Sequence, residues 1–210
     1  MVFSSLTFLY LFLPLSLLFH YSTKNDLFRN IFLTIFSLVF YAWAEPMWIF
    51  LMVFTALFDY STGLYIEKKR GTPWAKVGLI ASILVNIGLL VAYKYGGFIY
   101  DNLNYLFPLP FDRPQNSLPV GISFYTFMVI SYVVDIYRGE IKAQRNPLNF
   151  LMFISLFQHL VAGPIVRYSQ ISEQVEKRTI DWTRMSDGVT RFCIGLFKKV
   201  AIANVAGVLV

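Results

Sequence analysis

Charged side chains are scarce in this chain of 210 residues: they make up 14% of it, whereas about 25% is usual for soluble proteins. Hydrophobic types account for 57%. A chain of this length can bury one sizeable core, but it cannot hide so much apolar surface while presenting so few charges to water. An ordinary soluble domain is therefore excluded. Intrinsic disorder is excluded too, because it needs low hydrophobicity and high charge. The remaining class is a polytopic membrane protein.

Several chemical signatures are also missing. Cys193 is the one cysteine, so the chain cannot form an intrachain disulfide. There is no Gly-rich phosphate loop, no zinc-ligand spacing and no G-x-S-x-G motif, and we expect no bound cofactor or metal. Lys and Arg outnumber Asp and Glu by 18 to 12. They stand in short clusters between apolar runs, which is typical of membrane-protein loops and argues against nucleic-acid binding.

Six apolar runs follow one another along the chain, each about as long as the roughly 20 residues that a helix needs to cross a bilayer. They cover residues 1–21, 27–44, 46–66, 77–98, 117–137 and 147–166. We interpret the first as an uncleaved span, because no basic residue precedes it as a signal peptide would require. Glu45-Pro46 predicts a tight hairpin between the second and third runs, since proline disfavours helical geometry in the residue before it. Trp43 and Trp48 are expected at the membrane interface beside it.

Basic clusters mark every second connection between the first five runs. They are Lys24 with Arg29, then Lys68, Lys69, Arg70 and Lys76, then Arg138, Lys142 and Arg145. The connections between these clusters are not basic. The positive-inside rule therefore predicts five complete spans, with an extracytoplasmic N-terminus and the basic clusters in the cytoplasm.

The sixth run breaks this alternation, because Arg167 and further basic residues follow it. Gly163-Pro164 stands near its end, and proline removes a backbone donor and clashes with the preceding turn. Broken helices at membrane depth occur only where they are buried in protein or line a wet cavity. We therefore predict a broken, re-entrant segment whose tail returns to the cytoplasmic side.

The last part of the chain changes pattern. Apolar residues recur at helical spacing from Met185 to Val200, with Arg184, Asp187 and Arg191 on the opposite face. This predicts an amphipathic helix that either lies along the membrane interface or docks on the bundle. Apolar sequence then continues to Val210 without a helix-end signal. We expect one transmembrane domain over residues 1–210, incomplete at its C-terminus.

A few polar residues within the apolar runs are candidates for function. His159 either acts in acid–base chemistry or bonds a carbonyl that the helix break frees. Asp59 has no local partner, and it either pairs with another helix or faces a wet cavity. Asp135 is expected to form an ion pair with Arg138, three residues further on. Together with the break itself, the candidate pocket residues are Asp59, Asp135, His159, Gly163, Pro164 and Arg167.

Several segments carry a resemblance to a known family. They are Phe40-Tyr41-Ala42-Trp43, Leu118–Phe127 (LPVGISFYTF) leading to Asp135–Gly139, His159–Arg167 (HLVAGPIVR) and Gly195–Val200 (GLFKKV). In this order and spacing they resemble the membrane-bound O-acyltransferase (MBOAT) family, and most of all its bacterial alginate O-acetylation (AlgI-type) branch. The resemblance covers Met1 to about Asn204 and corresponds to the N-terminal part of such proteins.

The resemblance implies an enzyme of the bacterial inner membrane. Its helices would form a funnel that moves an acyl group, here acetyl, from a cytoplasmic donor such as acetyl-CoA to an extracytoplasmic polysaccharide or a periplasmic transferase partner. The family's catalytic histidine is expected beyond Val210, so no catalytic residue is assigned within this chain, and the chain alone is expected to be inactive. The alternative is a polytopic transporter or a non-catalytic assembly component, because discontinuous helices also build transporter sites.

Basic side chains could attract the polyanionic donor. The residues in question are Lys68, Lys69, Arg70, Arg167 and Lys199. Their other interpretation is that they only set the topology of the chain in the membrane.

Overall fold

The computed structural model describes residues 3–107, 110, 112–113, 118–160, 163–178 and 181–209. These residues form helices and no strand, so the all-α prediction is confirmed. The elements in chain order are η1 (Phe8–Phe12), α1 (Leu13–Ser22), α2 (Asp26–Ala44), η2 (Pro46–Trp48), α3 (Ile49–Lys68), α4 (Pro73–Leu90), η3 (Val91–Tyr95), α5 (Gly96–Leu106), α6 (Ile122–Arg138), α7 (Pro147–Ser155), α8 (Phe157–Leu160), α9 (Tyr168–Glu176), α10 (Trp182–Phe197), η4 (Lys198–Ala203) and α11 (Asn204–Leu209).

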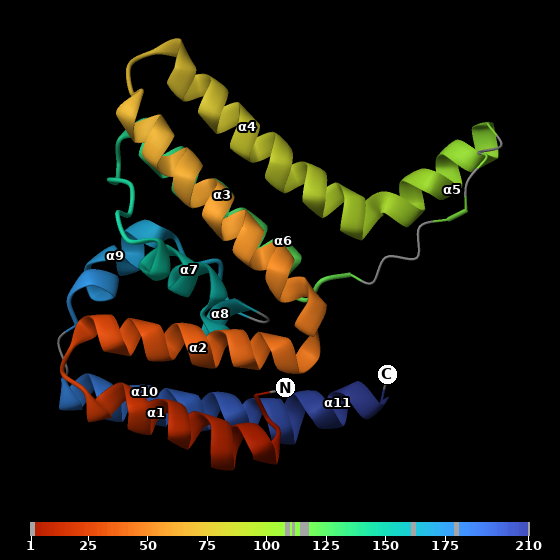
Figure 1. Cartoon of the computed structure of the whole chain (residues 1–210). Helices are drawn as coiled ribbons and strands as arrows, with labels where there is room; N and C mark the ends of the chain where they lie inside the picture. Colours follow the sequence, from red (N-terminus) through yellow and green to blue (C-terminus); the bar gives the residue numbers. More distant parts are fainter. Residues whose placement is uncertain are drawn as a thin grey trace.

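Each of the five predicted spans corresponds to one helical segment. Three of these are long and apolar enough to cross a membrane, namely α2, the η2–α3 helix (Pro46–Lys68) and the α4–α5 helix (Pro73–Leu106). The first run forms the shorter apolar helix Phe8–Ser22, and the fifth forms α6, which has 17 residues. The fourth run extends further than predicted, to Leu106, and it bends at η3 before α5 projects away from the rest (Figure 1).

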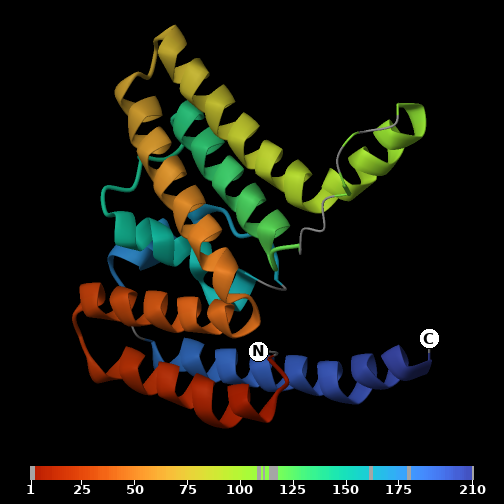
Figure 2. The ribbon, with the colours of Figure 1, turned by 45° about the vertical axis from the view of Figure 1, so that its right-hand side comes forward.

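Three helices, α3, α4 and α6, lie side by side in the upper part of the molecule (Figure 2). Small residues allow their close approach, since a Cβ at Gly63 would stand 2.9 Å from the Tyr132 ring and one at Gly78 would stand 3.0 Å from Ile66. Such small-residue contacts are common between membrane helices, where dispersion contacts replace the hydrophobic effect. Helices α1 and α2 form a second layer that crosses this group obliquely (Figure 1).

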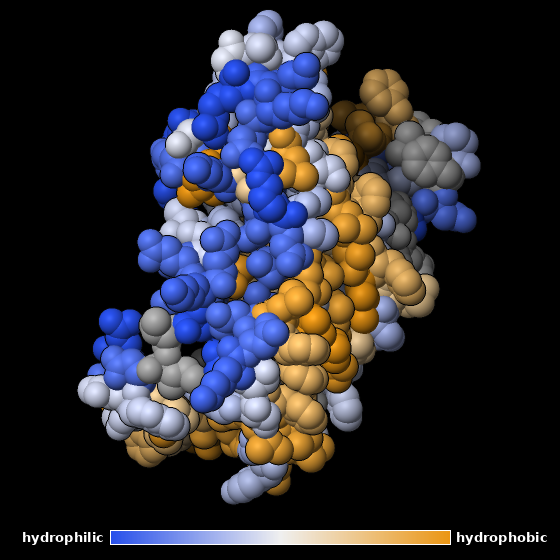
Figure 3. All heavy atoms as spheres, turned by 60° about the vertical axis from the view of Figure 1, so that its left-hand side comes forward, coloured by the Kyte–Doolittle hydropathy of each residue, from blue (hydrophilic) through white to orange (hydrophobic). Residues whose placement is uncertain are grey.

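The three basic connections, residues 23–25, 69–72 and 139–146, come to the same side of the molecule (Figure 1). The hairpin at residues 45–48 lies away from that side. Figure 3 shows hydrophilic residues as a continuous surface over this side, with hydrophobic residues next to it. The fold thus separates the connections in the way that the charge pattern predicts. Of the two hairpin tryptophans, Trp43 is exposed, whereas Trp48 packs edge-on against Tyr93 with ring centroids 4.9 Å apart.

The sixth run is broken as predicted, but it is interrupted earlier than the sequence indicates. Helix α7 ends at Ser155, and Leu156 leaves helical geometry with ψ 113° before the short α8. The first interruption therefore precedes Gly163-Pro164. Residues 163–167 are not helical either, so the predicted break is present, but the earlier one was missed. The chain does return toward the start of the segment, because the Gln144 side chain before α7 donates a hydrogen bond of 2.6 Å to the Tyr168 hydroxyl at the start of α9. The segment therefore enters and leaves on one side. That this is the cytoplasmic side stays a prediction. Val161 and Ala162 lie outside the described residues.

The predicted amphipathic helix is α10, which continues through η4 into α11. It lies at the same end of the molecule as α1 and α2 (Figure 1). Most of its side chains are exposed, with Met185 and Leu196 partly buried. Its location at a membrane interface stays a prediction.

Candidate functional site

The short helix α8 brings together three of the segments that carry the family resemblance. The Phe157 backbone N–H donates to the Ser37 hydroxyl of α2 at 3.3 Å, and the Phe157 ring lies 5.7 Å from that of Phe40. On the α6 side, the Leu160 carbonyl oxygen lies against Gly121, where an added Cβ would be 2.6 Å away. The ends of α2, α6 and α7–α8 thus meet at the broken helix, and this junction is our candidate site.

Gly121 makes this approach possible. Its φ of +77° lies in the left-handed region, which L residues with a Cβ rarely adopt. It starts α6 directly after a turn in which the Ile122 N–H donates to the Pro119 carbonyl at 3.2 Å. A side chain at Gly121 would therefore be strained and would also collide with the α8 backbone.

His159 is buried, and its Nε2 lies 2.9 Å from the Phe153 carbonyl oxygen. In a continuous helix that oxygen would accept a bond from the Phe157 N–H. The break diverts this N–H to Ser37, and His159 takes its place. Two of the backbone groups that the break frees thus receive a side-chain partner, as buried polar groups require. Of the two roles considered for His159, the geometry supports the bond to a freed carbonyl.

We therefore expect His159→Ala to lower the free energy of unfolding by about 1–3 kcal/mol, because the Phe153 carbonyl would be buried without a partner. His159→Gln should lose less, since a glutamine amide can still donate to that carbonyl. Thermal unfolding of the purified protein in detergent, followed by circular dichroism, measures both changes. Equal losses for alanine and glutamine would show that this hydrogen bond does not hold the break.

Two tyrosines of the resemblance segments also lie near this junction. Tyr41 of α2 and Tyr125 of α6 are each 1% exposed, and among the described residues neither hydroxyl has a hydrogen-bond partner. Both belong to the same buried cluster of the core. Sequence reasoning missed them, although both stand inside the quoted segments, because it followed only charged residues and histidine. Buried hydroxyls without partners are candidates for binding a polar group of a ligand.

Asp59 lies apart from this junction, in the α3–α4 interface. It is fully buried and accepts hydrogen bonds from the Ser82 hydroxyl at 2.5 Å and from the Asn86 amide at 2.8 Å. Among the described residues no cation lies within ion-pair distance of it. The structure thus supports pairing with another helix, and it makes Asp59 a link between helices.

The expected ion pair between Asp135 and Arg138 was wrong. Arg138 instead pairs with Glu140, with 3.8 Å between Nη1 and Oε1, and one buried oxygen of Asp135 has no hydrogen-bond partner among the described residues. The turn at Gly139 explains this, because it folds Glu140 back until its N–H donates to the Asp135 carbonyl at 3.0 Å. Arg167, another of the candidate residues, lies close enough to Asp135 for their charges to interact.

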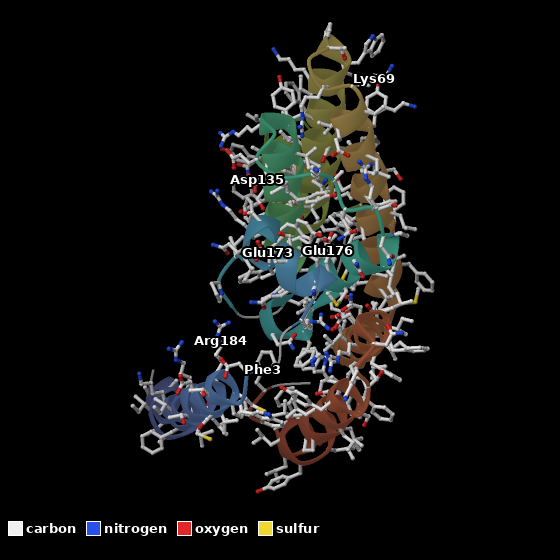
Figure 4. All side chains as sticks on the ribbon, turned by 90° about the vertical axis from the view of Figure 1, so that its left-hand side faces the viewer. Phe3, Lys69, Asp135, Glu173, Glu176 and Arg184 are labelled. Carbon is white, nitrogen blue, oxygen red and sulfur yellow. The ribbon has the colours of Figure 1, made fainter. Side chains whose placement is uncertain are left out.

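The remaining candidates separate into different places. Gly163 lies next to His159, since a Cβ there would be 3.2 Å from the His159 Cα, and Pro164 is exposed. Arg70 donates to the Ile136 carbonyl at 2.7 Å, so it stabilises the end of α6. Figure 4 shows Lys69 at one end of the molecule and Arg184 of α10 at the other, with Asp135, Glu173 and Glu176 between them. The five basic residues considered for donor attraction therefore do not form one patch, because Lys199 follows α10.

A buried polar network that the sequence did not indicate holds the entrance of the re-entrant segment. The Gln144 N–H donates to the Tyr132 hydroxyl at 3.0 Å, and its side-chain oxygen accepts from the Asn146 N–H at 3.0 Å. Burial raises the pKa of Tyr168, and the bond from the Gln144 amide opposes that rise. These bonds fix the connection from α6 to α7 against α9, and so they position the break.

The fold and the junction define an all-helical membrane protein with a re-entrant, broken helix. Comparison with known proteins narrows this class. The chain is 40% identical over 209 residues to the probable alginate O-acetylase AlgI of Pseudomonas aeruginosa, covering 97% of this chain and 40% of that protein. It is 39% identical to the same protein of Pseudomonas putida (99% and 44% covered), and 29% identical to the peptidoglycan O-acetyltransferase of Helicobacter pylori (97% and 45%).

These matches confirm the resemblance to the alginate O-acetylation branch of the membrane-bound O-acyltransferases. The chain spans less than half the length of each of these relatives. No family model and no solved structure matches it.

Proposed function

We propose that the protein carrying this chain is a membrane-bound O-acyltransferase of the bacterial inner membrane. It would take acetyl from a cytoplasmic donor such as acetyl-CoA and pass it to an extracytoplasmic polysaccharide or to a periplasmic transferase partner. The observation that carries the proposal is the meeting of three resemblance segments at α8, in a chain similar to proteins named O-acetylases. The N-terminus lies outside in this proposal, as the basic connections favour.

The geometry at α8 supports transfer across the membrane. A re-entrant segment that stops at α8 does not cross the whole bilayer. A donor from one side and an acceptor from the other could therefore meet near the break. In acyl transfer an acceptor oxygen attacks the thioester carbonyl, the C–S bond breaks, and the acceptor proton passes to the thiolate. The Tyr41 and Tyr125 hydroxyls could donate hydrogen bonds to an oxygen of either substrate.

Inside-out membrane vesicles test this proposal. Acetyl-CoA labelled in the acetyl group is added outside, at the cytoplasmic face, and the label bound covalently to a polysaccharide or protein acceptor in the lumen is measured. Covalent label in the lumen supports acyl transfer. Entry of the intact donor without covalent label would instead favour the transporter alternative.

The double variant Tyr41→Phe/Tyr125→Phe should lower the rate of transfer by roughly tenfold or more, since a substrate would lose hydrogen bonds in a buried site. Tyr10→Phe is the matched control, because Tyr10 is 79% exposed. The rate is measured in the same vesicles at equal protein content. An unchanged rate in the double variant would remove these hydroxyls from the site.

The chain of 210 residues by itself should transfer no acetyl, because the resemblance assigns the catalytic histidine to a later region. The chain is purified in detergent and incubated with labelled acetyl-CoA and an alginate acceptor. Labelled acceptor above the level of a no-protein control would contradict this prediction.

A further inference from the structure

A cavity of about 770 Å³ lies between the α1–α2 layer and the helix formed by α10 and η4. Figure 4 shows α10 set apart from α1 and α2, with Phe3 between them. The walls of the cavity are mainly apolar, and they include Phe8, Leu13, Leu33, Phe40, Phe157 and Phe192. The volume lies within the roughly 300–1,000 Å³ that is usual for small-molecule sites.

The charge of the cavity is as distinctive as its apolar walls. Among the described residues that line it, Lys199 is the one charged residue, and none is acidic. Among the described residues no ion pair or hydrogen bond engages the Lys199 side chain. The cavity therefore combines an apolar volume with a single cation that lacks a counter-ion.

We propose that this cavity binds one acyl chain of an anionic membrane phospholipid, with the lipid phosphate at Lys199. Bilayer lipids reach it directly, because its lining includes the exposed side chains Leu17 and Phe192. Phosphate is a normal partner for a lysine ammonium next to a membrane. Acetyl-CoA fits less well, because it has no long acyl chain and its several phosphates would meet only one cation. The lipid would fill the space between α1 and α10 and join the two.

Two glycines of α10 provide a matched test. A Cβ at either Gly195 or Gly188 would meet nothing within 4 Å, but only Gly195 lines the cavity. Tryptophan at position 195 should fill the cavity, whereas at position 188 it should leave it open. We expect protein purified from membranes in mild detergent to retain roughly tenfold less phospholipid in Gly195→Trp than in Gly188→Trp, as quantified by mass spectrometry of extracted lipid. Equal retention by the two variants would overturn the proposal.

Two adjacent lysines test the phosphate contact without changing any apolar wall. Lys199→Gln removes the lining cation, and Lys198→Gln removes an equal charge that does not line the cavity. Retained lipid should shift from anionic phosphatidylglycerol toward zwitterionic phosphatidylethanolamine in Lys199→Gln alone. An identical lipid composition in both variants would overturn the assignment of the phosphate to Lys199. A wild-type protein that retains no phospholipid, or whose Gly195→Trp variant changes only its oligomeric size, would contradict a lipid occupant altogether.

Discussion

Alanine in place of Gly121 should lower the free energy of unfolding by about 3 kcal/mol, the largest effect that we expect from adding a single methyl group. Two effects add up at this position. The φ of +77° imposes backbone strain on any residue with a Cβ, and that Cβ would lie 2.6 Å from the Leu160 carbonyl oxygen. Backbone cannot move aside as a side-chain tip can, so α6 and α8 would have to separate. Chemical or thermal unfolding in detergent measures the loss.

Two other glycines separate the two effects. Gly139 has a φ of +81°, but its nearest neighbour is the flexible Arg70 guanidinium at 3.4 Å, so Gly139→Ala should show backbone strain alone, about 1–2 kcal/mol. Gly88 lies inside α4 with nothing within 4 Å of an added Cβ, and Gly88→Ala should be neutral or stabilising by up to about 1 kcal/mol. If Gly121→Ala lost no more than Gly139→Ala, the contact with Leu160 would not matter.

The spans could be predicted from the sequence because their signal is local. Runs of apolar residues and clusters such as Lys68–Arg70 depend only on neighbours along the chain, and the membrane imposes length and charge rules on them. The helices and the separation of the connections follow these rules. The lengths of individual helices do not follow them, because the helical segment of the fourth run continues through α5 to Leu106.

The first interruption, at Leu156, could not be predicted, because it depends on residues far away in the sequence. Gly163-Pro164 is the strongest local signal, but the helix is first interrupted at Leu156. Ser37 accepts the freed N–H, and it belongs to α2. Nothing near Leu156 reveals that partner. The interruption is therefore a property of the packed structure.

The candidate site was only partly predictable for the same reason. The sequence identified His159 and the segments around it, but not the contact between Gly121 and Leu160 or the buried hydroxyls of Tyr41 and Tyr125. The prediction of an ion pair between Asp135 and Arg138 was wrong because spacing on a helix allows an ion pair without requiring it. The turn at Gly139 brings Glu140 to Arg138, which pairs with it instead.

The second large expected effect on stability comes from the hydrogen bonds to Asp59 that link α3 and α4. The double variant Ser82→Ala/Asn86→Leu should lower the free energy of unfolding by about 3 kcal/mol, because it leaves the Asp59 carboxyl group buried without either of its two donors. Replacing the acid as well, in Asp59→Leu/Ser82→Ala/Asn86→Leu, should recover much of that loss. The recovery follows because an apolar interface between membrane helices leaves no polar group unsatisfied.

The direction of the second step is the critical result. If Ser82 and Asn86 are the groups that satisfy Asp59, the triple variant must be more stable than the double variant, although it lacks one more native side chain. Ser61→Ala is the control on α3, since its hydroxyl donates to the Leu57 carbonyl of its own helix, and it should change stability by less than about 0.5 kcal/mol. Unfolding of all variants in the same detergent gives the comparison. A triple variant less stable than the double variant would mean that Asp59 stabilises the protein through a group other than Ser82 and Asn86.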